Sequence, residues 1–172
     1  MKLSNLIACI CEGAAEEAII ELLLESDKLI FNRQQLLEEQ IIRCRKAENF
    51  EKRYLRKGFS EKISIIRILD SRKERFKLSN AYKEKIDIIN IVTSPEIEML
   101  IIFKENKYSD FKKSRRKPSE FCSIDLHYHN VKSKTFIKHY FKDIETLIYA
   151  IQEYRRISRI PKEEYCLTDL LR

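Results

Sequence analysis

Glycine is scarce in this 172-residue chain, which contains only Gly13 and Gly58. Average usage of about 7% would supply about a dozen glycines. The Walker loop and the dinucleotide-binding fingerprint each need two or more glycines at fixed spacing, so the sequence excludes both. A nucleotide site built in another way stays open.

Long apolar runs are missing too. The longest run, Leu6–Cys11, is far shorter than the ~20 residues that cross a bilayer. The first residues lack the basic region and the long apolar stretch of a signal peptide. The five cysteines are an odd number without paired spacing. We therefore expect reduced, buried thiols in a cytoplasmic protein, with no membrane association.

Charged residues make up 35% of the chain and hydrophobic residues 44%, a balance typical of one globular domain at this length. The net charge of +7 is concentrated in residues 104–142, which hold eleven basic and four acidic residues. The rest of the chain is neutral. The positive charge therefore predicts one binding surface rather than a basic protein as a whole.

The hydrophobic pattern alternates between strands and helices. Strands are predicted over residues 6–11, 28–31, 63–69 and 87–93. Helices are predicted over residues 14–25, 34–57 (ended by Gly58), 72–85, 94–103 (capped by Ser94, with Pro95 in its first turn) and 135–158, with a basic loop at 112–118. This order favours an α/β fold, a three-layer sandwich with a mostly parallel central sheet. We expect a single domain over residues 1–172, with a C-terminal helical extension from about residue 135.

Acidic residues follow the predicted strands. Glu12 comes after the first strand, Asp70 after the strand 63–69, and Glu98 one turn into the helix after the strand 87–93. The carboxyl ends of parallel strands form the usual site edge of an open sheet. Three carboxylates there would suit Mg²⁺ or Mn²⁺ and would be candidate catalytic groups. The alternative is two loop acids and one acid favoured by a helix N-terminus.

These segments resemble a known family. Cys11-Glu12-Gly13-Ala-Ala-Glu16 is similar to the Glu-Gly-x-x-Glu opening of TOPRIM domains in OLD-type and abortive-infection nucleases. Ile68-Leu69-Asp70 resembles the strand that ends in the second TOPRIM acidic motif. Thr93-Ser94-Pro95-Glu-Ile97-Glu98-Met99-Leu100 resembles a segment of the related RloB-like family, and the resemblance covers about residues 5–140 in the family's order.

The resemblance implies a TOPRIM-like fold and a Mg²⁺- or Mn²⁺-dependent nuclease that cuts RNA such as tRNA. It further implies a toxin or effector of an anti-phage defence system that works with a separately encoded ATPase. Glu12 would be a general acid/base or metal-side carboxylate, Asp70 a metal ligand and Glu98 a third acid or ligand, with Glu16 as a further candidate. The chain departs from the family's Asp-x-Asp motif, because Arg72 follows Asp70-Ser71. Glu74 is a weaker substitute for the missing acid.

Basic residues of segment 104–142 are candidates for binding nucleic-acid phosphates. The candidates are Lys112, Lys113, Arg115, Arg116, Lys117, Lys132, Lys134 and Lys138. Interleaved aromatic residues would stack on unpaired bases, as in single-stranded nucleic acid. The preference for tRNA comes only from the resemblance. A solvated basic face or an acidic protein partner is the alternative.

His127 and His129 would lie on one side of a strand. They would be a metal-binding pair, a general base in the case of His127, or polar residues at the surface. The alternative function for the chain is a non-catalytic module that binds nucleic acid or docks on an ATPase with a degenerate TOPRIM site. An enzyme acting on small phosphorylated substrates would leave the basic segment unexplained. The charged residues 34–57 would also suit self-association into a homo-oligomer.

Overall fold

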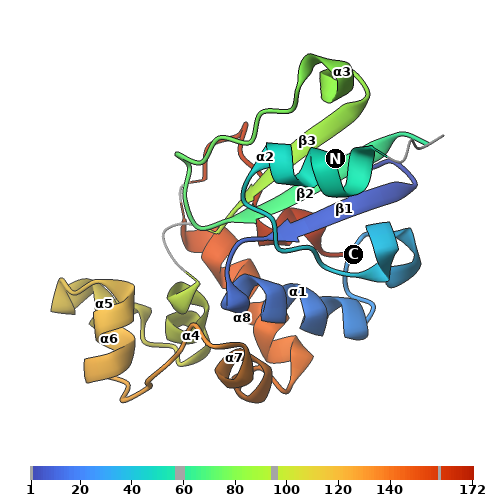
Figure 1. The fold of residues 1–172 in the computed structure, drawn as a ribbon. Helices are drawn as coiled ribbons and strands as arrows, with labels where there is room; N and C mark the ends of the chain where they lie inside the picture. The colour runs from blue at the N-terminus through green and yellow to red at the C-terminus, as the bar shows by residue number, and fades with distance from the viewer. Residues whose placement is uncertain (1, 57–60, 94–96, 159) are drawn as a thin grey trace.

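A parallel three-stranded sheet lies at the centre of the protein (Figure 1). The computed structural model describes residues 2–56, 61–93, 97–158 and 160–172. Strands β1 (Leu6–Cys11), β2 (Ile63–Leu69) and β3 (Ile86–Val92) pair in the order β1-β2-β3, and both pairings are parallel. The predicted strands 6–11 and 63–69 are confirmed at these bounds, and the third begins one residue early. The predicted α/β class is confirmed.

Helices cover both faces of the sheet and make three layers (Figure 1). One face packs against helices α1 (Ala14–Glu25), α4 (Glu98–Lys104), α7 (Lys134–Tyr140) and α8 (Ile144–Ile157) through the larger apolar core. The other face packs against α2 (Ala47–Phe50) and the π-helical turn Glu51–Leu55 through a smaller core. Strand alternation sends Ile7 and Cys9 to the larger core and Ala8 and Ile10 to the smaller one.

The predicted helix 34–57 is wrong over most of its length. The chain forms short 3₁₀ turns at Arg33–Gln35 and Leu37–Glu39, and then an extended stretch before α2. Glu38 and Glu39 have φ near +54° and +53°, which interrupts a helix. Ile42 donates its amide to the Cys9 carbonyl at 2.8 Å, so the apolar residues of this segment cover the outer edge of β1. Gly58, predicted to end the helix, lies outside the described residues.

The predicted helix 72–85 is also mostly wrong, since only α3 (Asn80–Lys83) is helical. Phe76 and Leu78 are both buried in the smaller core, and their spacing of two residues suits an extended chain. The predicted helix after β3 is confirmed as α4. The Ser94-Pro95 cap lies outside the described residues.

The predicted basic loop 112–118 is instead the junction of helices α5 (Tyr108–Ser114) and α6 (Pro118–Ile124). Phe111 packs edge-on against Phe121, which holds the two helices together, and Arg115 turns the chain with φ of 56°. In Figure 1 this pair of helices extends beyond α4, away from the sheet. The basic residues are therefore carried by an ordered helical hairpin.

The predicted helix 135–158 is two helices, α7 and α8. Asp143 starts the second by accepting a hydrogen bond from the Glu145 amide at 3.1 Å, as an N-cap residue does. Phe141, which follows α7 at the break, is fully buried in the larger core. A 3₁₀ turn, Leu167–Leu170, follows α8.

Residues 28–31, predicted as a strand, form only one isolated antiparallel bridge, between Leu29 and Leu171. Around it, the Ile30 amide donates to Leu170 O and the Arg172 amide donates to Lys28 O, each at 2.9 Å. The last residues of the chain thus close against the segment that follows α1.

All five cysteines are thiols, and four of them are buried. Cys9 and Cys11 share one face of β1, as predicted. The pKa of the Cys11 thiol is raised well above its ordinary value. The main cause is a hydrogen bond with Cys9, and the second is burial. Across the described residues, no helix combines the length and the apolar character needed to span a membrane.

Candidate active site

The acidic residues singled out by sequence stand at the carboxyl ends of the three strands. Glu12 follows β1 directly, Asp70 follows β2, and Glu98 is the first residue of α4, the helix after β3. They do not share the same partners. Glu12 forms an ion pair with Arg67 and interacts with Glu74. The charges of Asp70 and Glu98 instead raise the pKa of Glu16.

Glu12 forms a buried ion pair with Arg67, a residue of β2. Arg67 Nη2 donates to Glu12 Oε1 at 2.8 Å, and the two side chains are 1% and 5% exposed. The guanidinium lies over the Phe76 ring, 4.6 Å from its centre, and Nη2 is 3.6 Å from Glu74 Oε2. Sequence analysis missed Arg67. Its signal was a single charged residue inside an otherwise apolar strand, which predicts a buried partner.

The Glu12 carboxyl group is poised for proton transfer. Burial raises its pKa, and hydrogen bonding and charge repulsion from Glu74 raise it further, while Arg67 opposes the change; the outcome is a pKa of about 7. A carboxyl group with this pKa exchanges protons readily at neutral pH.

Glu16, in the first turn of α1, folds back over Gly13 and is buried. A Cβ atom at position 13 would collide with Glu16 Oε2, so glycine makes room for this carboxylate. Burial raises the pKa of Glu16, its own backbone amide opposes this, and the charges of Asp70 and Glu98 raise the pKa further while Lys132 lowers it. The Glu16 carboxylate therefore occupies the space beside Gly13.

Glu98 is fully buried, and neither of its carboxylate oxygens has a hydrogen bond within the described part of the chain. Lys132 Nζ lies 3.1 Å from Glu98 Oε1, an ion pair without hydrogen-bond alignment. The Lys132 side chain is 57% exposed, so it reaches the buried carboxylate from the surface. Burying a carboxylate without hydrogen-bond donors is unfavourable, so the nearby charge of Lys132 matters for this group.

The structure thus assembles Glu16, Asp70, Glu98 and Lys132 into one electrostatic neighbourhood, which we call the Glu98 cluster. Glu12 stands apart from it in the pair with Arg67. Among the described residues, no three His, Cys, Asp or Glu side chains are placed to hold a metal ion together. Mg²⁺ is commonly held by one or two carboxylates plus waters and substrate phosphates, and the orphaned oxygens of Glu98 fit that donor set.

Arg72 is paired with an acidic residue from a distant part of the chain. Its Nε donates to both carboxylate oxygens of Glu164, at 2.8 and 3.0 Å. This pair fixes the loop after β2, where Asp70 is exposed, to the segment before the last 3₁₀ turn. Arg72 and Glu74 line a hollow of about 340 Å³ beside β3.

His127 and His129 are exposed in the loop between α6 and α7 rather than on a strand, so the predicted shared strand face is wrong. His127 has φ of 56°, and the Nδ1 atom of His129 is 3.5 Å from Ser123 Oγ.

The predicted nucleic-acid-binding residues fall into two groups. One group forms ion pairs: Lys134 with Glu17 and Glu21, Lys138 with Glu21 and Glu25, Arg116 with Asp125, and Lys132 with Glu98. The other group is exposed on the α5–α6 hairpin and has no ion pair to the described residues: Lys112, Lys113, Arg115 and Lys117. We call this second group the hairpin cations.

The aromatic residues of the basic segment pack on one another. Phe136 stacks on Tyr140 and meets Tyr128 edge-on, while Tyr108 stacks on Phe103. All of them lie against the larger core. Their rings are engaged within the protein rather than arranged as a platform for bases.

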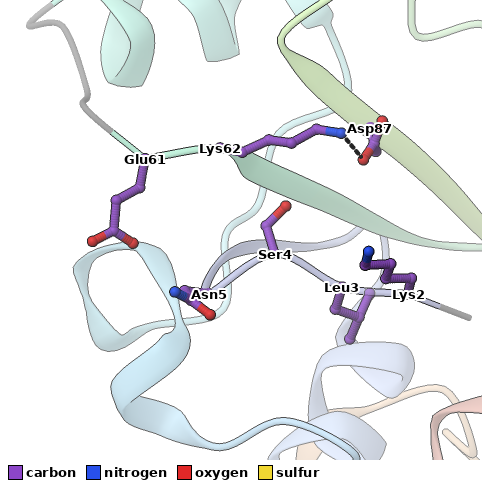
Figure 2. Close-up of a pocket in the computed structure, with 7 residues that line it drawn as sticks. All are labelled: Lys2, Leu3, Ser4, Asn5, Glu61, Lys62 and Asp87. Atoms are coloured by element: carbon purple, nitrogen blue, oxygen red, sulfur yellow. Dashed lines mark ion pairs between the residues drawn. The ribbon is translucent and has the colours of Figure 1, made fainter.

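The opposite end of the sheet has a separate hollow of about 460 Å³, at the amino ends of the strands. Figure 2 shows its lining, where Lys62 pairs with Asp87 at 2.7 Å and Glu61 projects away from that pair. It contains none of the residues predicted to be functional.

Compared with known proteins, the chain matches no family profile, no curated protein and no solved structure.

Proposed function

We propose that the chain is a Mg²⁺- or Mn²⁺-dependent nuclease acting on RNA. The observation that carries this proposal is the fully buried Glu98 carboxylate, which has no hydrogen bond to any described residue and stands at the carboxyl edge of a parallel sheet. A hard divalent cation is the partner that such oxygens lack.

Within this proposal, Glu98 and Glu16 hold the cation, and Asp70 stands at the exposed margin of the Glu98 cluster. The cation, when bound, supplies an activated water and neutralises charge that develops on the phosphate. Gly13 lets Glu16 keep its position, because a larger residue would displace the carboxylate.

Glu12 acts as the general base or acid. Its pKa of about 7 lets it accept a proton from water, or deliver one to a leaving oxygen, at neutral pH. Arg67 holds Glu12 Oε1 and keeps the side chain oriented. Arg67 is therefore a positioning residue.

The hairpin cations bind the phosphate backbone of the substrate. Their helices pack against α4, the helix that begins with Glu98. Because the aromatic rings are packed internally, we expect contacts to phosphates rather than stacking on bases, which favours a folded RNA such as tRNA over a flexible single strand. The roles as a defence effector with a partner ATPase, the cytoplasmic location and any homo-oligomer rest on the resemblance and on sequence composition.

The test is cleavage of end-labelled tRNA and single-stranded DNA with Mg²⁺ or Mn²⁺. We compare wild type with Glu98→Gln and with Glu61→Gln, the same exchange at an exposed position on the opposite edge of the sheet (Figure 2). We expect Glu98→Gln to lose cleavage by at least about 100-fold and Glu61→Gln to retain it. Cleavage that survives in Glu98→Gln contradicts the assigned site.

A non-catalytic RNA-binding module, the second candidate, is favoured by Arg72, which stands in the place of a family acid and is paired with Glu164. This candidate predicts salt-sensitive RNA binding with no cleavage under any divalent cation, including when the partner ATPase is present.

A further inference from the structure

The contact between Lys132 and Glu98 joins an exposed cation to a fully buried anion. Lys132 Nζ is 3.1 Å from Glu98 Oε1, and the lysine side chain is 57% exposed while that of Glu98 is 0% exposed. The other lysine ion pairs of this region are different, because Lys134 and Lys138 meet partly exposed carboxylates on α1. Lys132 alone among these three reaches a carboxylate that solvent does not touch.

We propose that the Lys132 ammonium group occupies, in the cation-free protein, the place at Glu98 that a divalent cation takes on binding, so that the two compete for one carboxylate. This inference rests on the proposed function only in requiring a divalent-cation site at Glu98. It adds a built-in competitor to that site.

The chemistry of the contact supports competition. A buried carboxylate needs a compensating positive charge, and Lys132 provides one. The ammonium group is not aligned for a hydrogen bond with either oxygen of Glu98, so the pair is electrostatic in character. A divalent cation brings twice the charge and binds carboxylate oxygen directly.

The local fold lets the Lys132 side chain leave without disturbing the backbone. Ser133 caps α7 by accepting a hydrogen bond from the Phe136 amide at 3.1 Å. Lys134 then anchors α7 to Glu17 and Glu21 on α1 at 2.7 and 2.8 Å. The residues that follow Lys132 are thus fixed, so the ammonium group can move off Glu98 by rotation of the flexible four-carbon side chain.

When the cation binds, Glu98 no longer neutralises the ammonium group, and its positive charge becomes available beside the cation site. A charge in that position suits a substrate phosphate, which is the third partner that Mg²⁺ sites commonly use. Cation binding would therefore prepare the cluster for an anionic substrate.

The experiment measures Mn²⁺ binding by calorimetry and the thermal midpoint with and without Mn²⁺. The variants are Lys132→Met, which keeps the length of the side chain without its charge, and Lys132→Arg, which keeps a cation. Lys134→Met is the matched control. We expect Lys132→Met to bind Mn²⁺ about tenfold more tightly than wild type, with a lower midpoint in chelator that Mn²⁺ restores. Lys132→Arg and Lys134→Met should stay within about twofold of wild type.

A second measurement uses the wild-type protein alone. Acylation of lysines by a water-soluble active ester, read by mass spectrometry, should modify Lys132 faster when Mn²⁺ is present, while Lys134 and Lys138 serve as internal references. Tighter binding by Lys132→Met and faster acylation of Lys132 are the expected results.

Unchanged or weaker Mn²⁺ binding by a folded Lys132→Met, or unchanged acylation of Lys132, overturns the competition. If Lys132→Met does not fold, the acylation result decides alone. Failure of the proposed function looks different, because then neither wild type nor Lys132→Met binds Mn²⁺ at millimolar concentrations and the site itself is absent.

Discussion

Arg67 Nη2 donates a hydrogen bond to Glu12 Oε1 at 2.8 Å, which ties the residue after β1 to the interior of β2. Both side chains are almost completely buried, and Arg67 also meets Phe76 and Glu74. A buried ion pair is costly to break on one side, because the remaining charge loses its partner in a medium of low dielectric constant.

Removal of Arg67 alone should therefore destabilise the protein strongly. We expect Arg67→Leu to lower the free energy of unfolding by about 3–5 kcal/mol, as urea denaturation would measure it. The double variant Arg67→Leu/Glu12→Leu should recover part of this loss, because it leaves no uncompensated charge. A double variant as unstable as the sum of the single ones would show that the pair does not couple.

Stability should fall as the pH rises between about 4.5 and 7. The pKa of Glu12 is about 7 in the folded protein, against an ordinary value of 4.5, so the folded state keeps its proton in this window while the unfolded state loses it. The stabilisation is complete below pH 4.5 and is lost as the pH passes 7, by on the order of 1–2 kcal/mol after solvent screening. Chemical denaturation across pH should show this slope in wild type and a flatter one in Glu12→Gln.

Gly13→Ala should weaken the Glu98 cluster. The added methyl group would collide with Glu16 Oε2 and push that carboxylate out of its buried position. We expect a loss of about 1–2 kcal/mol in stability, together with weaker Mn²⁺ binding measured by calorimetry. Gly13→Ala/Glu16→Ala should regain the stability but not the Mn²⁺ affinity. Full Mn²⁺ affinity in the double variant, which lacks the Glu16 carboxylate, would remove Glu16 from the site.

Charge reversal of the hairpin cations should weaken RNA binding whatever the base sequence of the RNA. In Lys112→Glu/Lys113→Glu/Lys117→Glu, the slope of log affinity against log salt should fall by up to about three, one for each lost phosphate contact. Fluorescence anisotropy with labelled tRNA in chelator measures this without cleavage. The control Lys77→Glu/Lys83→Glu/Lys85→Glu makes the same charge change on the exposed segment around α3. Equal losses in both triple variants would point to net charge rather than to this surface.

The helices and strands that were predicted correctly are those whose pattern of apolar residues fits only one type of secondary structure. The run Ile63–Leu69 is too short and too β-branched for anything but a buried strand, and Ala14–Glu25 repeats at helical spacing. The prediction of secondary structure was wrong where apolar residues pack against distant parts of the chain instead of lining one side of a helix. Leu36 and Ile42 line the edge of β1 rather than one side of a helix, and the left-handed conformation of Glu38 has no signal in its residue type.

The candidate site was predicted in its location but not in its grouping. Parallel strands placed Glu12, Asp70 and Glu98 at one edge, as topology requires. Which acids face each other depends on side-chain direction, and on Arg67, which pairs with Glu12. Lys132 was predicted to bind phosphate, and its contact with Glu98 depends on loop packing between α6 and α7 that no local pattern encodes.

The bridge between Leu29 and Leu171 joins residues far apart in the chain. A ribosome makes the segment after α1 long before it makes residues 166–172, so this bridge forms only after residue 171 has been made. Until then, Leu29 and Phe31, which are buried in the finished protein, lack part of their cover. Glu164, which holds Arg72 and the loop with Asp70, lies just before residues 166–172, so the loop gains this contact only after residue 164 has been made. A nascent chain that stops before these residues would therefore contain all three strands of the sheet without the contacts that hold the loop after β2 and cover the segment after α1.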